Sequence, residues 1–217
     1  MELRPLEPFI PMPQIIQIDP LNPDPAAIQK VLLILKSGGV IAYPTETFYG
    51  LGADACDEKA IHQIFAAKGR DFKNPIPLII HEKSALARWV SDMPEIAEKL
   101  IEKFWPGPLT LVFQAAPAIH PRLTAETGKI GIRVSSHPIA TILAKLLQCP
   151  VTATSANLSG ASECTNAAQV REQLGDKIDA ILDGGPTPGG KGSTIVDVSV
   201  TPVRVLREGV IPASLIL

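Results

Sequence analysis

Hydroxyl side chains, glycines and permanent cations stand directly after several short apolar runs of this sequence. Glycine lets the backbone approach a ligand closely, while hydroxyls, guanidinium groups and free backbone N–H groups bind phosphates and carboxylates. The segments that combine these groups are residues 44–52, 68–70, 129–133, 152–160 and 184–194. Together they predict a site for a nucleotide or a similar polyanion.

Each of these segments, taken alone, also has a structural explanation. Two cations around a glycine at 68–70 are ordinary residues for the end of a helix. The hydroxyls of 44–52 and 152–160 suit tight turns whose side chains bond to their own backbone. Arg133 ends an apolar run, so it either lies at the exposed end of a strand or needs a buried carboxylate or phosphate partner.

Residues 185–191 come close to the P-loop motif G-x-x-x-x-G-K-[ST]. Gly192 stands where that motif needs a hydroxyl residue. Residues 195–198 indicate a strand, whereas a P-loop leads into a helix. We therefore expect no P-loop here, and we do not expect Lys191 to act as a P-loop lysine.

Other kinds of site find little support in the sequence. The histidines lack metal-ligand spacing, no G-x-S-x-G motif is present, and no aromatic–basic pattern indicates base stacking. The cysteines, at positions 56, 149 and 164, are few and scattered. We therefore expect a reducing compartment, no disulfide framework, no zinc site and no metal ligands.

The bulk composition is that of a globular protein. Of 217 residues, 46% are hydrophobic and 19% are charged, and the formal net charge is -2. A chain of this length holds one well-buried core or at most two small ones, and its charge is too acidic for a protein that coats nucleic acid. The N-terminus lacks a signal-peptide pattern, and no run of about 18 apolar residues exists. We expect a cytoplasmic protein with no membrane contact.

The elements that must position these segments alternate between helices and short apolar strands. We expect a proline-rich arm at 1–13 and one domain at 14–217. The predicted helices run from Pro25 to the glycines at 38 and 39, then over 58–67, 94–104, 138–147 and 166–174. The predicted strands are 14–18, 40–43, 77–81, 109–113, 130–134, 151–154, 179–182, 194–200 and 203–207. Because strands without helices close the chain, we predict a single α/β domain on a twisted mixed parallel and antiparallel sheet.

Nine sequence motifs follow one another along the chain: GGVIAYPTETFYGLGA (38–53), AAKGR (66–70), PLIIH (77–81), WPGPLTL (105–111), IGIRVSSHPIA (130–140), TATSANLSG (152–160), ILDGG (181–185), STIVDV (193–198) and VLREGVI (205–211). In this order they resemble the motifs of the YrdC family, and the resemblance covers residues 14–212. The family's characteristic K-x-R and S-x-N are both present, as Lys68/Arg70 and Ser155/Asn157. Residues 71–77 depart from the family's commoner run, which leaves open which of them contacts ATP.

The resemblance implies a YrdC-like fold and an activity. L-threonine, bicarbonate or CO2 and ATP would give threonylcarbamoyl-AMP and pyrophosphate, a nucleotidyltransferase reaction with Mg2+ carried by the nucleotide. Partner proteins would then transfer the threonylcarbamoyl group to an adenosine of tRNA. Because the chain stops soon after the last shared strand, it resembles the short family members rather than those with a second C-terminal domain.

The family pattern also implies roles for individual residues. Those expected near threonine are Thr45, His81, Arg133 and Ser193. Those expected to hold ATP are Lys68, Arg70, Lys129, the backbone of Ala153, Ser155, Asn157 and Arg207. Four of the ATP residues, Lys68, Arg70, Ser155 and Asn157, are the expected catalytic set. Because negative charge grows on the departing pyrophosphate, cations placed there stabilise the transition state. No side-chain general base is evident, so we expect catalysis mainly by positioning and charge.

Two other functions stay open on the sequence alone. One is a module that binds tRNA or other double-stranded RNA by shape and has no chemistry of its own. The acidic composition and the intact K-x-R and S-x-N pairs speak against it, because RNA binding does not require them. The other is a maturation subunit that adenylates a carbamoyl group from carbamoyl phosphate, for which the chain lacks companion domains.

Overall fold

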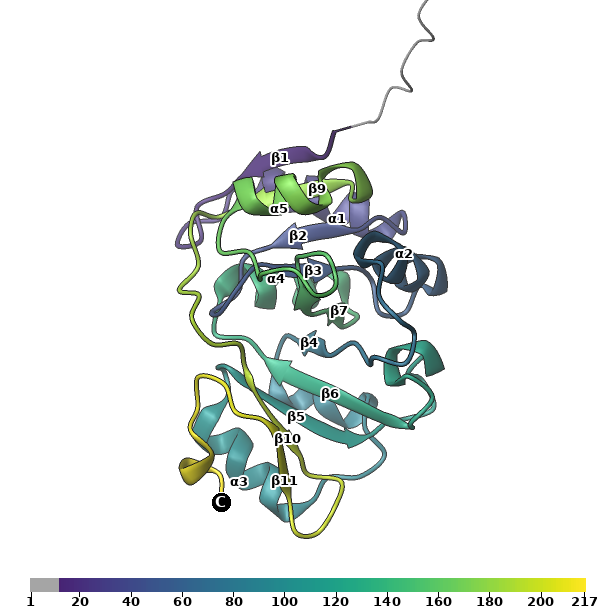
Figure 1. The fold of residues 1–217 in the computed structure, drawn as a ribbon, viewed down its shortest axis with the longest axis vertical. Coiled ribbons are helices and arrows are strands. Elements are labelled where there is room, and N and C mark those ends of the chain that lie inside the picture. Colours follow the sequence, from purple (N-terminus) through teal and green to yellow (C-terminus); the bar gives the residue numbers. More distant parts are fainter. Residues whose placement is uncertain (1–11) are drawn as a thin grey trace, which may run out of the picture.

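The computed structural model describes residues 12–217, so most of the arm predicted at 1–13 lies outside the described residues. Within these residues, eleven strands form two hydrogen-bonded sheets, and Figure 1 shows them one above another, from β1 at the top to β11 at the bottom. The first sheet has the order β1 (Gln14–Gln17), β9 (Ala180–Asp183), β2 (Ile41–Tyr43), β3 (Gly50–Gly52) and β8 (Thr154–Ser155). The second has the order β11 (Arg204–Arg207), β10 (Thr194–Asp197), β5 (Leu109–Gln114), β6 (Lys129–Val134), β4 (Leu78–Ile80) and β7 (Val151–Thr152).

Both sheets mix parallel and antiparallel pairs, which confirms the predicted fold class. β1 and β2 run parallel to β9, whereas β3 runs antiparallel to β2 and to β8. In the second sheet β5–β10 and β4–β6 are parallel, and the remaining pairs are antiparallel. The predicted sheet is thus divided into two. Within the described residues the chain passes between them after β3, after β7 and after β9, and the shortest of these crossings is the single residue Ala153 between β7 and β8.

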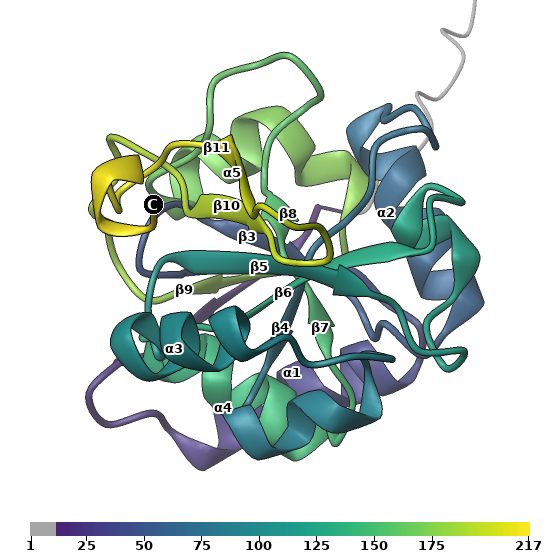
Figure 2. The same ribbon diagram turned by 90° about the horizontal axis from the view of Figure 1, so that it is seen from below.

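In the described part of the chain, five α-helices pack around the strands at the positions that the sequence predicts. They are α1 (Pro25–Lys36), α2 (Glu58–Lys68), α3 (Glu95–Phe104), α4 (Pro138–Leu147) and α5 (Ala167–Leu174). Figure 2 shows α1, α3 and α4 on one side of the strands and α5 on the other. Short 3-10 segments lie at Lys83–Arg88, Pro121–Thr124, Gly175–Lys177 and Ala213–Leu215. Across residues 12–217, no helix combines the length and the apolar character needed to cross a bilayer.

The crossing at Ala153 brings the ends of several strands together. The Ala153 N–H donates to Pro77 O at 2.8 Å, which ties the crossing to the start of β4. One residue earlier, Thr152 Oγ1 accepts from Ala53 N at 2.9 Å and donates to Leu51 O at 3.0 Å. These bonds hold β7 against the end of β3, so both sheets meet around the S-x-N segment.

β3 is a strand that the sequence does not predict, because residues 50–52 fall in a segment expected to be a loop. Gly-Leu-Gly has one side chain and therefore no alternating pattern that would predict a strand, yet each of its residues pairs with a residue of β2. A Cβ on Gly52 would lie 2.7 Å from Cε1 of Tyr43. Glycine is therefore needed here, because the ring of Tyr43 packs directly over the β3 backbone.

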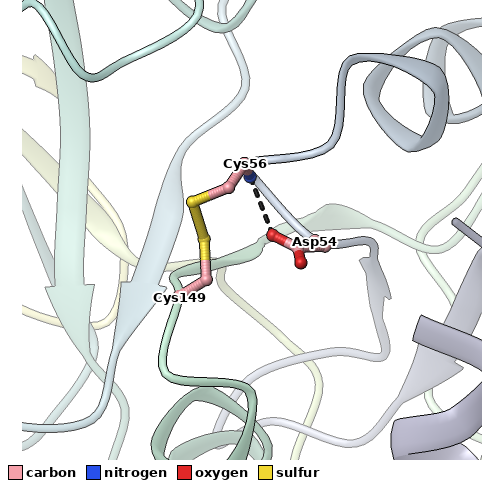
Figure 3. A group of neighbouring side chains, drawn as sticks. All are labelled: Asp54, Cys56 and Cys149. Carbon is pink, nitrogen blue, oxygen red and sulfur yellow. Dashed lines mark hydrogen bonds between the residues drawn. A yellow bond between two sulfur atoms is a disulfide. The ribbon is translucent and has the colours of Figure 1, made fainter. Parts of the chain in front are cut away.

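The sequence predicts no disulfide framework, but the structure contains a disulfide. Cys56 and Cys149 form a disulfide, which Figure 3 shows beside Asp54, while Cys164 is free and buried. The partners are 93 residues apart in the sequence. Their meeting depends on the isolated bridge between Asp54 and Val151, which no spacing of cysteines reveals. The disulfide connects the segment before α2 to the segment before β7.

Candidate active site

A cavity of about 290 Å³ lies where the two sheets meet. Its walls come from the loop after β2, the loop after α2, the ends of β6 and β8, and the segments at 192–195 and 207. Of the predicted site residues, the cavity is lined by Thr45, Arg70, Arg133, Ala153, Ser155, Ser193 and Arg207. The fold thus brings together residues from all five segments at which the sequence predicts an anion site.

The loop after β2 is held by its own hydroxyls. Thr45 Oγ1 donates to Phe48 O at 2.7 Å and lies 3.2 Å from Thr47 Oγ1. The phenol of Tyr49, at the end of this loop, donates to Gly185 O at 2.7 Å. Burial, together with the nearby Asp183 carboxylate, raises the pKa of Tyr49, so the phenol stays neutral and keeps donating. Hydrogen bonds at Thr45 and at Tyr49 therefore fix both ends of this loop before a ligand binds.

Ser193 and Arg207 form a second wall. The guanidinium of Arg207 donates to Ser193 O from Nη2 at 2.8 Å and from Nε at 3.2 Å. Ser193 Oγ lies 3.0 Å from Thr110 Oγ1 and accepts from Arg207 Nη2 at 3.3 Å. Burial lowers the pKa of Arg207, although an arginine stays charged at any physiological pH. This wall presents a hydroxyl and a permanent cation together.

Arg133 is 6% exposed and is the next-to-last residue of the strand β6. Its Nε lies 3.3 Å from Glu46 Oε1, and both side chains are almost fully buried. The sequence predicts that a buried Arg133 needs a carboxylate or phosphate partner, and Glu46 is that partner. Glu46 itself is not predicted as a site residue, because nothing in the spacing pairs it with a residue 87 positions later.

Arg70 also lines the cavity. Its Nε donates to Asn74 O at 3.3 Å and its Nη2 to Pro75 O at 3.0 Å. These bonds hold the backbone of residues 74 and 75 close to the side chain of Arg70. Arg70 therefore fixes the conformation of the loop at 71–77, the segment that departs from the common family sequence. Glu163, which the sequence analysis does not single out, also lines the cavity, and among the described residues it is the one carboxylate that does so.

Lys68 lies behind the cavity wall and is 2% exposed. Its Nζ donates to Ser155 O, to Asn157 O at 2.7 Å and to Asn157 Oδ1 at 3.3 Å. Asn157 Nδ2 in turn donates to Leu158 O at 2.9 Å and Ala161 O at 2.7 Å. The K-x-R and S-x-N motifs therefore meet, but in this structure Lys68 and Asn157 fix the loop that presents Ser155. Burial, with a smaller effect of Arg70, lowers the pKa of Lys68 to about 8.

Besides Lys68 and Asn157, two further predicted residues do not line the cavity. His81 follows β4 with its Nε2 3.6 Å from Glu82 Oε1, and it lines two other surface depressions. Lys129 begins β6, and its Nζ is 2.9 Å from Asp197 Oδ2. Their predicted contacts with threonine and ATP stay predictions that depend on the motif resemblance.

The glycine-rich segment at 184–194 leads into the strand β10 and not into a helix, as expected. Lys191 is 65% exposed on its side chain and lies 3.7 Å from Glu208 Oε1. Gly189 and Gly190 have φ of 69° and 79°, which is the left-handed region that glycine adopts without strain. The segment forms part of the cavity wall through Gly192 and Ser193. Lys191 does not line the cavity and instead pairs with Glu208 on the surface.

The family model of the Sua5/YciO/YrdC proteins, described as "Telomere recombination", matches residues 33–209. The chain belongs to this family. A threonylcarbamoyl-AMP synthase of Pyrococcus abyssi is 41% identical over 178 residues, which are 82% of this chain and 52% of that protein. The chain spans about half the length of the curated relatives that match it first.

Two solved structures support the family assignment. The crystal structure of P. abyssi Sua5 complexed with L-threonine has a TM-score of 0.90 at 38% identity, and covers 93% of this chain and 59% of that one. The crystal structure of Escherichia coli YciO has a TM-score of 0.88 at 30% identity, and covers 95% of this chain and all of that one. The described fold is thus that of the shared family domain.

Proposed function

We propose that this chain joins L-threonine, bicarbonate or CO2 and ATP into threonylcarbamoyl-AMP and pyrophosphate. The observation that carries the proposal is the cavity in which a buried guanidinium, that of Arg133, stands among the hydroxyls of Thr45 and Ser193. A planar guanidinium suits the carboxylate of an amino acid. The P. abyssi relative, crystallised with L-threonine, supports the choice of amino acid.

A second group of cations suits the triphosphate. Arg70 and Arg207 line the same cavity, and Ser155 adds a hydroxyl on the loop that Lys68 fixes. The cavity's single described carboxylate, Glu163, suits a Mg2+ ion that is held mainly by phosphates and water. Bound with the nucleotide, Mg2+ would share the charge of the phosphates.

In the adenylation step, an oxygen of the threonine carbamate attacks the α-phosphorus of ATP. The new bond forms between that oxygen and phosphorus, and the bond to the bridging oxygen breaks, so the electron pair leaves with pyrophosphate. Arg70 and Arg207 stabilise the charge that grows on the leaving group. Arg133, Thr45 and Ser193 hold threonine so that its carbamate lies in line with the phosphate.

Downstream proteins that modify tRNA would consume the product, and we place the reaction in the cytoplasm, where ATP and tRNA are available. The Cys56–Cys149 disulfide speaks against this placement, because disulfides are rare in a reducing cytoplasm.

An RNA-binding module without catalysis is less well supported, because Arg70, Arg133 and Arg207 line a cavity and not a broad surface.

The proposal is tested by following nucleotide products while each substrate is omitted in turn. The protein should form AMP-linked product and pyrophosphate, without ADP, only when both threonine and bicarbonate are present. Equal turnover with threonine left out would contradict the proposal.

A further inference from the structure

A buried ion pair lies at the cavity wall, with Arg133 lining the cavity and Glu46 behind it. Glu46 Oε1 is 3.3 Å from Arg133 Nε, with side chains 10% and 7% exposed. Among the described residues neither of these two atoms has a hydrogen-bond partner, so their geometry is that of a charge pair, not of an aligned bond. Arg133 lines the cavity and Glu46 does not. The carboxylate therefore stands on the protein side of the guanidinium.

The second oxygen of Glu46 is anchored by a short chain of hydrogen bonds. Ser135 Oγ donates to Glu46 Oε2, and the backbone N–H of His137 donates to Ser135 Oγ at 3.1 Å. Ser135 follows Arg133 by two residues at the end of β6, whereas Glu46 belongs to the loop after β2. Glu46 thus connects the loop that carries Thr45 to the strand that carries Arg133, and its carboxylate is fixed from both directions.

This placement leaves one edge of the guanidinium for a ligand. A carboxylate can meet arginine along the edge that contains Nε or at the end formed by the two terminal nitrogens. Glu46 stands at Nε, and no hydrogen bond within residues 12–217 engages the terminal nitrogens of Arg133. An incoming carboxylate would bind end-on, with two parallel hydrogen bonds in a fixed direction.

We infer that Glu46 is a positioning residue, which holds Arg133 end-on to the cavity and thereby sets the affinity for the amino-acid carboxylate. The inference rests on the proposed function, because it concerns the threonine half of that site. Fixing the guanidinium before binding removes rotamer freedom that the ligand would otherwise have to restrict. Glu46 acts through Arg133 and has no contact with ATP in this account.

Two substitutions at Glu46 separate position from charge. Glu46→Ala removes the support of Nε, so the dissociation constant for threonine should rise by about tenfold or more. Glu46→Gln keeps an oxygen towards Nε and a polar group towards Ser135 while it removes the charge. Because the charge of Glu46 opposes an incoming anion, the Gln variant should bind threonine within about threefold of the parent.

The control is Asp179→Ala. Asp179 Oδ2 accepts from Val40 N at 2.7 Å, so this carboxylate holds the start of β2 as Glu46 holds the loop after its end. Calorimetric titrations with threonine, and separately with a non-hydrolysable ATP analogue, would be made on all variants. Glu46→Ala should lose threonine selectively, with unchanged affinity for the analogue, and Asp179→Ala should lose neither.

Three results would overturn the inference: a threonine affinity of Glu46→Ala within twofold of the parent, equal losses for threonine and the analogue, or a Gln variant as weak as the Ala variant. If Glu46→Ala does not fold, Ser135→Ala gives the same test, because it frees Glu46 Oε2 and should weaken threonine binding selectively. A parent that binds no threonine at all would instead refute the proposed function.

Discussion

Lys68 offers a sharp test of how the two motifs of the site act on each other. Its position at the end of α2 suggests a solvent-exposed cation, and from the sequence alone its loss should cost little stability. The structure contradicts that expectation, because the side chain is buried and its ammonium donates to three oxygens of Ser155 and Asn157. Lys68→Met keeps the apolar stem and removes the donors.

The magnitude follows from these contacts. A hydrogen bond from a charged donor contributes about 1.5–3 kcal/mol, and an acceptor left buried without a donor costs about 1–3 kcal/mol. Removing the ammonium also relieves the cost of burying a charge, which offsets part of the loss. We therefore expect the free energy of unfolding to fall by about 2–4 kcal/mol, which lowers Tm by about 5–15 °C in a domain of this size. Turnover should fall too, because the loop that presents Ser155 is released.

The assay is thermal and urea unfolding of the parent, of Lys68→Met and of Lys59→Met. Lys59 is an exposed lysine of the same helix, and its substitution should change stability by less than about 0.5 kcal/mol. A Tm of Lys68→Met within about 1 °C of the parent, a shift too small for the loss of three such bonds, would refute the reasoning. The ammonium would then be free for the triphosphate, as the family pattern implies.

The same lysine predicts a pH dependence. Its pKa is lowered to about 8 by burial and by Arg70, so in the folded protein the ammonium loses its proton as pH rises through this value. A neutral amine has fewer hydrogens than the three acceptors require, so turnover should decline above pH 8.

The lowered pKa of Lys68 also affects stability, because in the unfolded chain this lysine holds its proton up to its ordinary pKa of about 10.4. The contribution of Lys68 to the free energy of unfolding therefore rises with pH between the two pKa values. An alkaline limb that persists unchanged in an active Lys68→Arg variant would assign it to another group.

Three further predictions concern the cavity and the disulfide. Arg133→Lys should weaken threonine binding by about 2–4 kcal/mol and ATP binding much less, because lysine cannot donate two parallel hydrogen bonds to a carboxylate. Titration with each ligand measures both affinities. An unchanged threonine affinity would show that Arg133 does not bind threonine. Arg70→Ala should cut turnover by about 10–1000-fold with little change in Tm, whereas Lys191→Ala should cost at most about 1 kcal/mol of ATP affinity. An inactive Lys191→Ala beside a normal Arg70→Ala would put the phosphates elsewhere. Reducing the Cys56–Cys149 disulfide should lower the free energy of unfolding by about 3–5 kcal/mol, as expected for a loop of this length, and a Tm that is indifferent to reductant would contradict it.

The helices could be predicted because each carries its own local information. In α1, Asp24 caps the first turn by accepting from Ala26 N and Ala27 N, and the apolar residues at 28, 31, 32 and 35 are all buried. These signals act within a few residues, so spacing alone reveals them. β3 carries no such signal, since its glycines are dictated by the ring of Tyr43 on the neighbouring strand.

The site could be predicted as a set of anion-binding segments, but not as a set of contacts. The sequence predicts that a buried Arg133 needs a partner, and only the fold shows that Glu46 supplies it. The same holds for Lys68, whose burial depends on the S-x-N loop lying across the end of α2. Such pairings join residues that are far apart in the sequence. Which of the chain's carboxylates lies next to Arg133 is decided by the topology of the sheets.

The most direct test of the account is to look for the adenylate itself. The protein would be incubated with ATP, Mg2+, threonine and either ordinary or 13C-labelled bicarbonate, and the products separated and weighed by mass spectrometry. The account predicts a threonine-dependent adenylate whose mass rises by one unit with the labelled carbon, together with an equal amount of pyrophosphate. An adenylate that lacks the label, or ADP as the nucleotide product, would contradict it.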